Sequence, residues 1–231
     1  MSAKFVPRVL TVERKQRLSS ISLELRDRAV PDSSFLGNSI TGDETFVYGY
    51  DPETSFQSSQ WKSPSSPCAK YVRQSRSNIK LMMIVFFDLD GIVWAEFVPK
   101  NTKVNSEYYK DLLERLRKDV RRKRANGFIL RHGNVPCHTS LLVRQFLLNK
   151  NITVYPNPPY SPDLAPCDFW LFLKVKMTMK GKCFEWVQDI EAATIAQLKT
   201  LTKEDLQNCF RYWQERWDRC VRSEEEYFEG D

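Results

Sequence analysis

The sequence has no hydrophobic stretch long enough to cross a membrane, and it has few glycines and histidines, eight and two in 231 residues. Its longest apolar run, Leu81–Phe87, has seven residues, far fewer than the ~20 that a membrane-spanning helix needs. No basic stretch followed by an apolar segment opens the chain, so we expect no secretory signal. These absences predict a protein with no membrane partner.

Paired metal-binding cysteines are also missing. The six cysteines never form a C-x-x-C pair, and His132 and His138 lie six residues apart without a cysteine at zinc-ligand spacing. Zinc sites are typically built from such closely spaced ligands. We therefore expect reduced, structural thiols in an intracellular protein, and we expect His138 to order a strand-to-helix turn.

The composition is that of a folded protein with one sizeable core. Hydrophobic residues make up 42% of the chain and charged residues 28%, which is close to the globular average and excludes wholesale disorder. We expect residues 1–30 to form a linker segment with a short helix, and residues 31–231 to form the main domain. Within that domain, residues 51–78 are rich in Ser, Pro and Gln and predict a long excursion from a sheet.

Positive charge is concentrated in two segments, although the net charge is only +6. Residues 68–80 contain four bases and no acid, and residues 110–124 contain eight bases and three acids. Residues 223–231 contain acids and no base. Such separation is typical of a protein with one face on a polyanion such as DNA, and solvated helix faces are the alternative. The candidate DNA-binding residues are Lys70, Arg73, Arg76, Lys80, Arg121, Arg122, Lys123 and Arg124.

The hydrophobic periodicity alternates between strand and helix patterns. Strands are predicted at 39–50, 80–87, 92–98, 127–131 and 152–155, and helices after Thr11 and at 106–124, 139–150, 167–180, 186–198 and 203–222. Gly91 is expected to supply a positive φ in a hairpin, and the stripe containing Trp213 and Trp217 is expected to be core. This order favours a mixed sheet with helices packed on it.

Three segments carry recognisable motifs: 41–45 (T-G-D-E-T), 131–139 (R-H-G-N-V-P-C-H-T) and 158–169 (P-P-Y-S-P-D-L-A-P-C-D-F). They resemble the T-G-D-E, H-D-N-A-P-x-H-T and Y-S-P-D-L-A-P-x-D motifs of mariner-type transposases. Two positions depart from the family pattern, since Gly133 stands where the family has Asp and Val135 where it has Ala.

The resemblance runs from about residue 5 to the end of the sequence. Residues 5–10 (F-V-P-R-V-L) are similar to the family's W-V-P-x-x-L linker motif, with Phe5 in place of Trp. The family's N-terminal pair of helix-turn-helix modules, which reads the transposon ends, has no counterpart in these residues, so we expect no recognition of a specific inverted repeat.

The resemblance implies a ribonuclease H-like fold, with a mixed five-stranded sheet flanked by helices. It also implies a three-carboxylate site that holds two Mg²⁺ (or Mn²⁺) ions for DNA strand cleavage and transfer. Asp43 corresponds to the first carboxylate and Asp168 to the third, and Gly133 occupies the second position. The 34 residues between Gly133 and Asp168 match the mariner spacing.

The chemistry of such a site explains why the change at position 133 matters. Two-metal phosphodiester cleavage uses ions ~3.5–4 Å apart, and Mg²⁺ prefers carboxylate and other oxygen ligands that offset its charge. With Gly133, only Asp43 and Asp168 remain as ancestral catalytic and metal-binding residues. Glu44 is expected to face away from Asp43, because successive strand side chains point to opposite faces. We therefore expect weakened metal binding and no catalysis.

The sequence is thus interpreted as a degenerate mariner-type transposase, a nuclear, DNA-binding remnant that forms a weak homodimer or a monomer. One alternative is an active metal-dependent endonuclease or transposase with an unorthodox site. Another is a host-retained module that binds DNA or a protein partner without chemistry.

Overall fold

The computed structural model describes residues 11–53, 75–123, 127–155, 157–158 and 161–222. Its centre is a five-stranded sheet with the order β3-β2-β1-β4-β5. The strands are β1 (Ser39–Tyr48), β2 (Lys80–Phe87), β3 (Ile92–Phe97), β4 (Ile129–Arg131) and β5 (Thr153–Val154). β1, β2 and β3 pair antiparallel, whereas β4 pairs parallel with β1 and with β5. The predicted mixed five-stranded sheet is confirmed.

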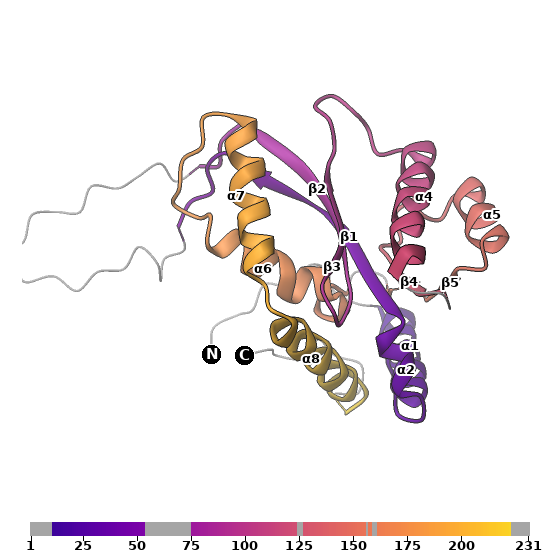
Figure 1. Ribbon diagram of the computed structural model, residues 1–231. Coiled ribbons are helices and arrows are strands. Elements are labelled where there is room, and N and C mark those ends of the chain that lie inside the picture. The colour runs from indigo at the N-terminus through magenta and orange to yellow at the C-terminus, as the bar shows by residue number, and fades with distance from the viewer. Residues whose placement is uncertain (1–10, 54–74, 124–126, 156, 159–160, 223–231) are drawn as a thin grey trace, which may run out of the picture.

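Helices cover both faces of this sheet (Figure 1). The helical segments are α1 (Val12–Ala29), α2 (Ser33–Gly37), α4 (Ser106–Lys123), α5 (Leu141–Asn149), η1 (Pro162–Leu164), the π-helix η2 (Cys167–Leu171), α6 (Phe172–Met177), α7 (Val187–Thr200) and α8 (Lys203–Arg222). Apolar side chains of α4 and α5 pack on one face, and those of α1, α6, α7 and α8 pack on the other. In the described part of the chain, no helix is both long and apolar enough to span a membrane.

The first helix depends on the main domain for its support. Leu18 and Leu25 of α1 are buried in the same core as residues of α8, and the two helices are in contact. Thr11 stands at the N-cap position, but its side chain accepts no capping hydrogen bond, so the expected cap is not formed. Packing on α8, rather than capping, therefore holds α1 in place.

Helix α8 begins with a capping box formed by Thr202 and Asp205. The Asp205 N–H donates to Thr202 Oγ1 and the Thr202 N–H donates to Asp205 Oδ2, both at 3.1 Å. Each side chain thus satisfies a backbone donor that has no partner within the helix. Trp213 and Trp217 are almost fully buried, which confirms that their stripe is core.

The β2–β3 turn is held by a side chain rather than by glycine conformation. Asp88 Oδ1 accepts hydrogen bonds from the backbone N–H groups of Asp90, at 2.7 Å, and Gly91, at 3.0 Å. In the described residues, only Gly127 and Gly181 are glycines with positive φ, so the expectation for Gly91 was wrong. An aspartate that bonds its own turn supplies the constraint that we assigned to glycine.

Arg131, at the end of β4, is a buried arginine that packs against α8 and has no carboxylate partner among the described residues. The Arg131 side chain is fully buried, its Nη2 donates to Asn157 Oδ1 at 2.9 Å, and its Cζ lies 4.6 Å from the centre of the Trp213 ring. Its Nε and Nη1 atoms have no hydrogen-bond partner. Burial lowers the pKa of Arg131 to about 9, so its charged form is disfavoured in the folded state.

We expect Arg131→Met to stabilise the protein, because methionine fills a similar volume without a charge or unpaired donors. The free energy of unfolding from urea denaturation should rise by about 1–3 kcal/mol. The control Arg122→Met changes a side chain that is 81% exposed and should shift it by no more than about 0.5 kcal/mol. A loss of stability in Arg131→Met would show that the stacking on Trp213 outweighs the burial cost.

Candidate functional site

The first candidate carboxylate, Asp43, is held on the central strand. Asp43 lies opposite Val85 in the antiparallel β1–β2 pair, and its Oδ1 accepts a hydrogen bond from the Glu44 backbone N–H at 2.8 Å. On the other edge of β1, β4 pairs with Ser39–Thr41, just before Asp43. The position of this carboxylate is therefore set by the sheet.

The second candidate carboxylate, Asp168, comes from the π-helix η2. Pro166 precedes this helix, and the Asp168 N–H donates to the Ala165 carbonyl at 2.9 Å. The predicted helix does begin at Cys167, but its first turn is wider than an α-helical turn. Single π-turns of this kind occur frequently at functional sites because they redirect one side chain.

Asp43, Gly133 and Asp168 meet at one pocket of about 580 Å³. Its other lining residues are Asn134, Val135, Pro136, Asn157, Pro158, Ser161, Pro162 and Ala165. The structure therefore brings together the three positions that the motifs predicted, although they come from a strand, a loop and a π-helix.

Gly133 leaves open space where a side chain can stand. A Cβ atom at this position lies 3.6 Å from Asp43 Oδ1 and 3.9 Å from His138 Nδ1, which are ordinary van der Waals distances. The φ angle of Gly133 is outside the positive range, so an L-residue is not strained there. A Cβ atom at position 133 therefore fits without backbone movement.

The carboxylates of this pocket repel one another. Burial, the charge of Glu44 and the charge of Asp168 together raise the pKa of Asp43 to about 8. Burial also raises the pKa of Asp168, and the nearby Lys176 ammonium lowers it. Lys176 is anchored through Thr45 Oγ1. Closely spaced carboxylates with raised pKa values are typical of sites that accept a cation or a shared proton.

Glu44, which the strand pattern predicts to face away from Asp43, still affects this site electrostatically. Its Oε1 lies 3.0 Å from His138 Nε2, without hydrogen-bond alignment, and its charge raises the pKa of Asp43 more than the charge of Asp168 does. Glu44 does not line the pocket that Asp43 and Asp168 share, but its charge acts on Asp43 all the same. Neighbouring side chains on a strand point in opposite directions, but two buried charges so close together still interact strongly because little water lies between them.

His138 orders the turn after β4, as predicted. Its Nδ1–H donates to the Gly133 carbonyl at 3.0 Å, and its ring stacks on Tyr109 with 3.7 Å between ring centres. Beside it, His132 has a pKa lowered to about 3 by burial and by His138, so its neutral ring accepts the Tyr109 O–H at Nδ1, 2.7 Å away.

The two ancestral carboxylates fit a single hard cation better than a pair. Asp43 and Asp168 supply the oxygen ligands that Mg²⁺ and Mn²⁺ prefer, but Gly133 supplies none. Within the described residues, no group of three or more His, Cys, Asp or Glu side chains is arranged to hold a metal ion. The donor set therefore does not fit two divalent ions.

The candidate DNA-binding residues that the structure describes do not form one patch. Lys80 lies opposite Tyr48 at one end of β1, whereas α4 ends at Lys123, close in sequence to Ile129, which pairs with Ser39 at the other end of β1. Arg121 and Arg122 are exposed on α4. Lys70, Arg73 and Arg124 lie outside the described residues.

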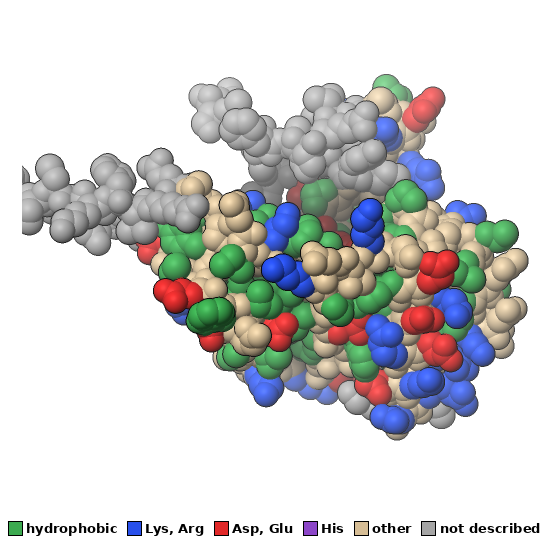
Figure 2. All heavy atoms as spheres, turned by 90° about the horizontal axis from the view of Figure 1, so that it is seen from above, with side chains coloured by type: hydrophobic (Ala, Val, Ile, Leu, Met, Phe, Trp, Pro, Cys, Tyr) green, Lys and Arg blue, Asp and Glu red, His purple; other side chains and the backbone are tan. Residues whose placement is uncertain are grey.

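Several cations also have acidic neighbours. Arg76 Nε lies 2.8 Å from Asp51 Oδ1, an acid from outside its own segment, and Arg122 Nη1 lies 3.2 Å from Asp119 Oδ1. Figure 2 shows Lys and Arg side chains interspersed with Asp and Glu over much of the visible face. The described cations of the two basic segments are therefore mixed with acidic side chains rather than gathered on one purely basic surface.

Comparison with known proteins relates this architecture to transposases. A family model described as Transposase (partial DDE domain) matches residues 51–129. The Mariner Mos1 transposase of Drosophila mauritiana is 28% identical over 235 residues, which cover 98% of this chain and 66% of that protein. The human histone-lysine N-methyltransferase SETMAR is 27% identical over 233 residues, covering 98% of this chain and 33% of that protein.

Solved structures of Mos1 match the fold closely. The Mos1 paired-end complex with the left transposon end has a TM-score of 0.90 at 28% identity, covering 99% of this chain and 67% of that one. The isolated Mos1 catalytic domain has a TM-score of 0.80 at 26% identity, covering 97% of this chain and all of that one. Mos1 paired-end complexes have also been solved with Mn and with Mg. The expected ribonuclease H-like fold is confirmed.

We expect the carboxyl group of Asp43 to titrate near pH 8 in carboxyl-detected NMR. Glu44→Gln should lower this pKa more than Asp168→Asn does, because the Glu44 charge has the larger effect. The folded pKa lies above the ordinary 3.8, so the stability that protonated Asp43 contributes is complete at low pH and is lost as the pH rises toward 8. A larger shift in Asp168→Asn than in Glu44→Gln would contradict this order.

Proposed function

Because the chain is homologous to the catalytic domain of the Mos1 mariner transposase, we propose that it is a degenerate transposase domain. In this proposal it binds duplex DNA without cutting or joining it, and it acts in the nucleus as a monomer or weak homodimer. The observation that carries the proposal is the absence of a side chain at Gly133, between Asp43 and Asp168 in the pocket.

Charge balance supports the loss of catalysis. A pair of divalent metal ions activates a nucleophile and stabilises the leaving oxygen of a phosphodiester. Here two carboxylates face the pocket, and Lys176 already lowers the pKa of Asp168. The chain's own residues can bind a phosphate-bearing strand at this pocket and exclude water from its buried side, but they lack a third acidic ligand.

DNA binding is supported by the exposed cations and by the relatives. Arg121 and Arg122 lie exposed at the end of α4, and Lys80 lies exposed at the start of β2. Mos1 has been solved with transposon-end DNA. Because the cations are dispersed, we propose contacts with phosphates rather than with base edges, which gives binding without sequence specificity.

A second candidate function is an active endonuclease with an unorthodox site. Glu44 favours it, because its carboxylate is near enough to raise the pKa of Asp43. In this alternative, Glu44 replaces the missing acidic side chain and the unmodified chain nicks DNA with Mg²⁺ or Mn²⁺. Supercoiled-plasmid nicking by the parent chain and by Glu44→Gln separates the two functions.

Binding to random-sequence duplex DNA tests the principal proposal. We expect the logarithm of the association constant to fall by ~0.9 per log unit of salt for each phosphate neutralised. The double variant Arg121→Gln/Arg122→Gln should lower the magnitude of this slope by about 1.8. The control Lys199→Gln/Arg211→Gln removes two exposed cations from α7 and α8 and should leave it unchanged. Affinity that is independent of salt, or equal effects of both double variants, would count against the proposal.

We expect Gly133→Asp to restore metal-dependent nicking, because the pocket has room for the side chain and the new carboxylate completes the ancestral ligand set. The rate of plasmid nicking in Mn²⁺ or Mg²⁺ should rise by about 10³-fold or more. Gly133→Asn has nearly the same shape without the charge and should not nick. Adding Asp168→Asn to Gly133→Asp should abolish the gain.

The decisive contrary result is a folded Gly133→Asp variant that binds Mn²⁺ by calorimetry but nicks no faster than the parent. That outcome would place the defect outside position 133.

A further inference from the structure

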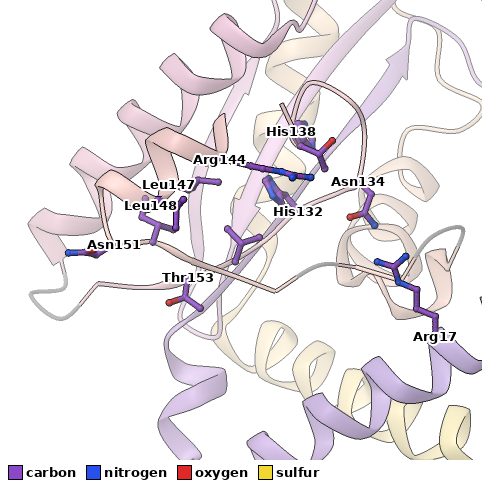
Figure 3. A pocket seen from close by; sticks show the side chains of 12 residues that line it. Arg17, His132, Asn134, His138, Arg144, Leu147, Leu148, Asn151 and Thr153 are labelled. Atoms are coloured by element: carbon purple, nitrogen blue, oxygen red, sulfur yellow. The ribbon is translucent and has the colours of Figure 1, made fainter. Parts of the chain in front are cut away.

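A second, larger cavity of about 870 Å³ lies next to the carboxylate pocket. It is bounded by α1, α5, β5 and the loop that follows β4 (Figure 3). In Figure 3, Arg144 extends from α5 toward His132 and His138, and Arg17 points from α1 toward Asn134. The cavity is thus open between two helices at the edge of the sheet, with a cation on each side.

The lining divides into an apolar part and a polar part. Leu147, Leu148, Ile152 and Val154 form the apolar part, and Asn134, Thr139, Asn151 and Thr153 contribute amide and hydroxyl groups. A cavity of this size, largely apolar with a few convergent polar groups, is typical of a site for a small organic group.

Among the described residues, the two arginines of the cavity have no acidic partner. Within the described part of the chain, neither Arg17 nor Arg144 is in an ion pair, and no Asp or Glu lines the cavity. Both side chains are exposed and can therefore move to meet a ligand. A pair of unpartnered guanidinium groups beside an apolar cavity complements an anionic ligand with an apolar body, and phosphate is an anion that arginine binds well.

The cavity and the carboxylate pocket share one wall. Asn134 lines both, while its neighbour His132 lines the larger cavity and Gly133 lines the carboxylate pocket. The Asn134 side chain donates to the Asn157 carbonyl, and Arg131 holds the Asn157 side chain. A DNA strand at the carboxylate pocket therefore has the cavity directly beside it.

We propose that this cavity holds one unstacked nucleotide of a bound DNA, with the base against Leu147, Ile152 and Val154 and a flanking phosphate on Arg17 and Arg144. The proposal rests on the proposed DNA-binding function. A nucleotide has a flat, largely apolar ring, a polar base edge and a negatively charged phosphate. These complement the apolar lining, the amide and hydroxyl groups, and the two arginines. Its occupancy couples strand binding to distortion of the duplex.

An acidic peptide is the competing occupant, since it too offers charge and apolar groups. The observations favour the nucleotide, because the cavity adjoins the pocket where a phosphodiester is proposed to lie and because Asn134 and Asn151 can bond a base edge. An acidic peptide gives no reason for the cavity to lie beside the carboxylate pocket, whereas a DNA strand does.

The test uses duplex DNA that contains one 2-aminopurine, a base whose fluorescence rises when it leaves the stack. None of the described residues that line the cavity is Trp, Tyr or Phe, so a base inside it escapes stacking on those rings and stays bright. Anisotropy of a second dye on the same duplex measures the bound fraction. Emission per bound duplex should rise with the parent chain, and Arg144→Glu should cut that rise by about tenfold, the effect of one hydrogen bond to a charged group.

Lys150→Glu is the matched control, because Lys150 follows α5, is exposed and does not line the cavity. It makes the same charge reversal and should keep the full emission rise. Leu148→Trp places an indole at the mouth of the cavity and should quench the emission while the duplex stays bound. The 5′-monophosphate of 2-aminopurine deoxyriboside, titrated alone, tests the cavity without a duplex.

The outcomes separate the two proposals. Duplex binding without any emission rise, or a rise that Arg144→Glu leaves intact, overturns the nucleotide cavity and leaves the DNA-binding function standing. Absence of duplex binding together with binding of the monophosphate, lost in Arg144→Glu, overturns the DNA-binding function and supports the cavity. Binding of an oligoglutamate peptide without binding of either nucleotide probe assigns the cavity to a protein partner and overturns the proposal.

Discussion

Three residues of β1, Ser39–Thr41, pair in parallel with three residues of β4, Ile129–Arg131, and this short contact sets the position of both cavities. The 132–138 loop follows β4 directly, and its residues are divided between the linings of the two cavities. A parallel pair needs a long connection between its strands, and α4 fills that role while covering one face of the sheet. The position of the site is thus set by the pairing of two strands that are far apart in the sequence.

Glycine at position 133 also affects the balance between folding and metal binding. Asp43 already has a raised pKa because burial and neighbouring carboxylates oppose its ionised form. A third carboxylate beside it adds repulsion that a bound cation offsets. With Gly133, the domain folds with fewer uncompensated charges, so its stability depends less on metal than that of a complete carboxylate site.

The parts of the fold that local chemistry dictates could be predicted from the sequence. The limits of α8 followed from its capping box and apolar stripe, and the convergence of Asp43 and Asp168 followed from motif resemblance. Features that depend on packing between distant segments could not be predicted in this way. No periodicity signals that Glu44 acts on Asp43 through a buried environment, or that Arg131 is enclosed by Trp213. The clustered bases of the sequence likewise separate in space because the chain between them crosses the whole sheet.

The enclosure of Arg131 by the core also bears on how this domain can change over generations. A buried charge with unpaired donors uses part of the small margin by which a natural protein stays folded. Most substitutions reduce that margin further, and a chain near its threshold is removed by cellular proteases. A domain that keeps such an arginine can therefore accumulate fewer neutral substitutions than a domain of the same size without it. Lineages that retain the arginine should vary most at exposed positions, where substitutions cost little stability.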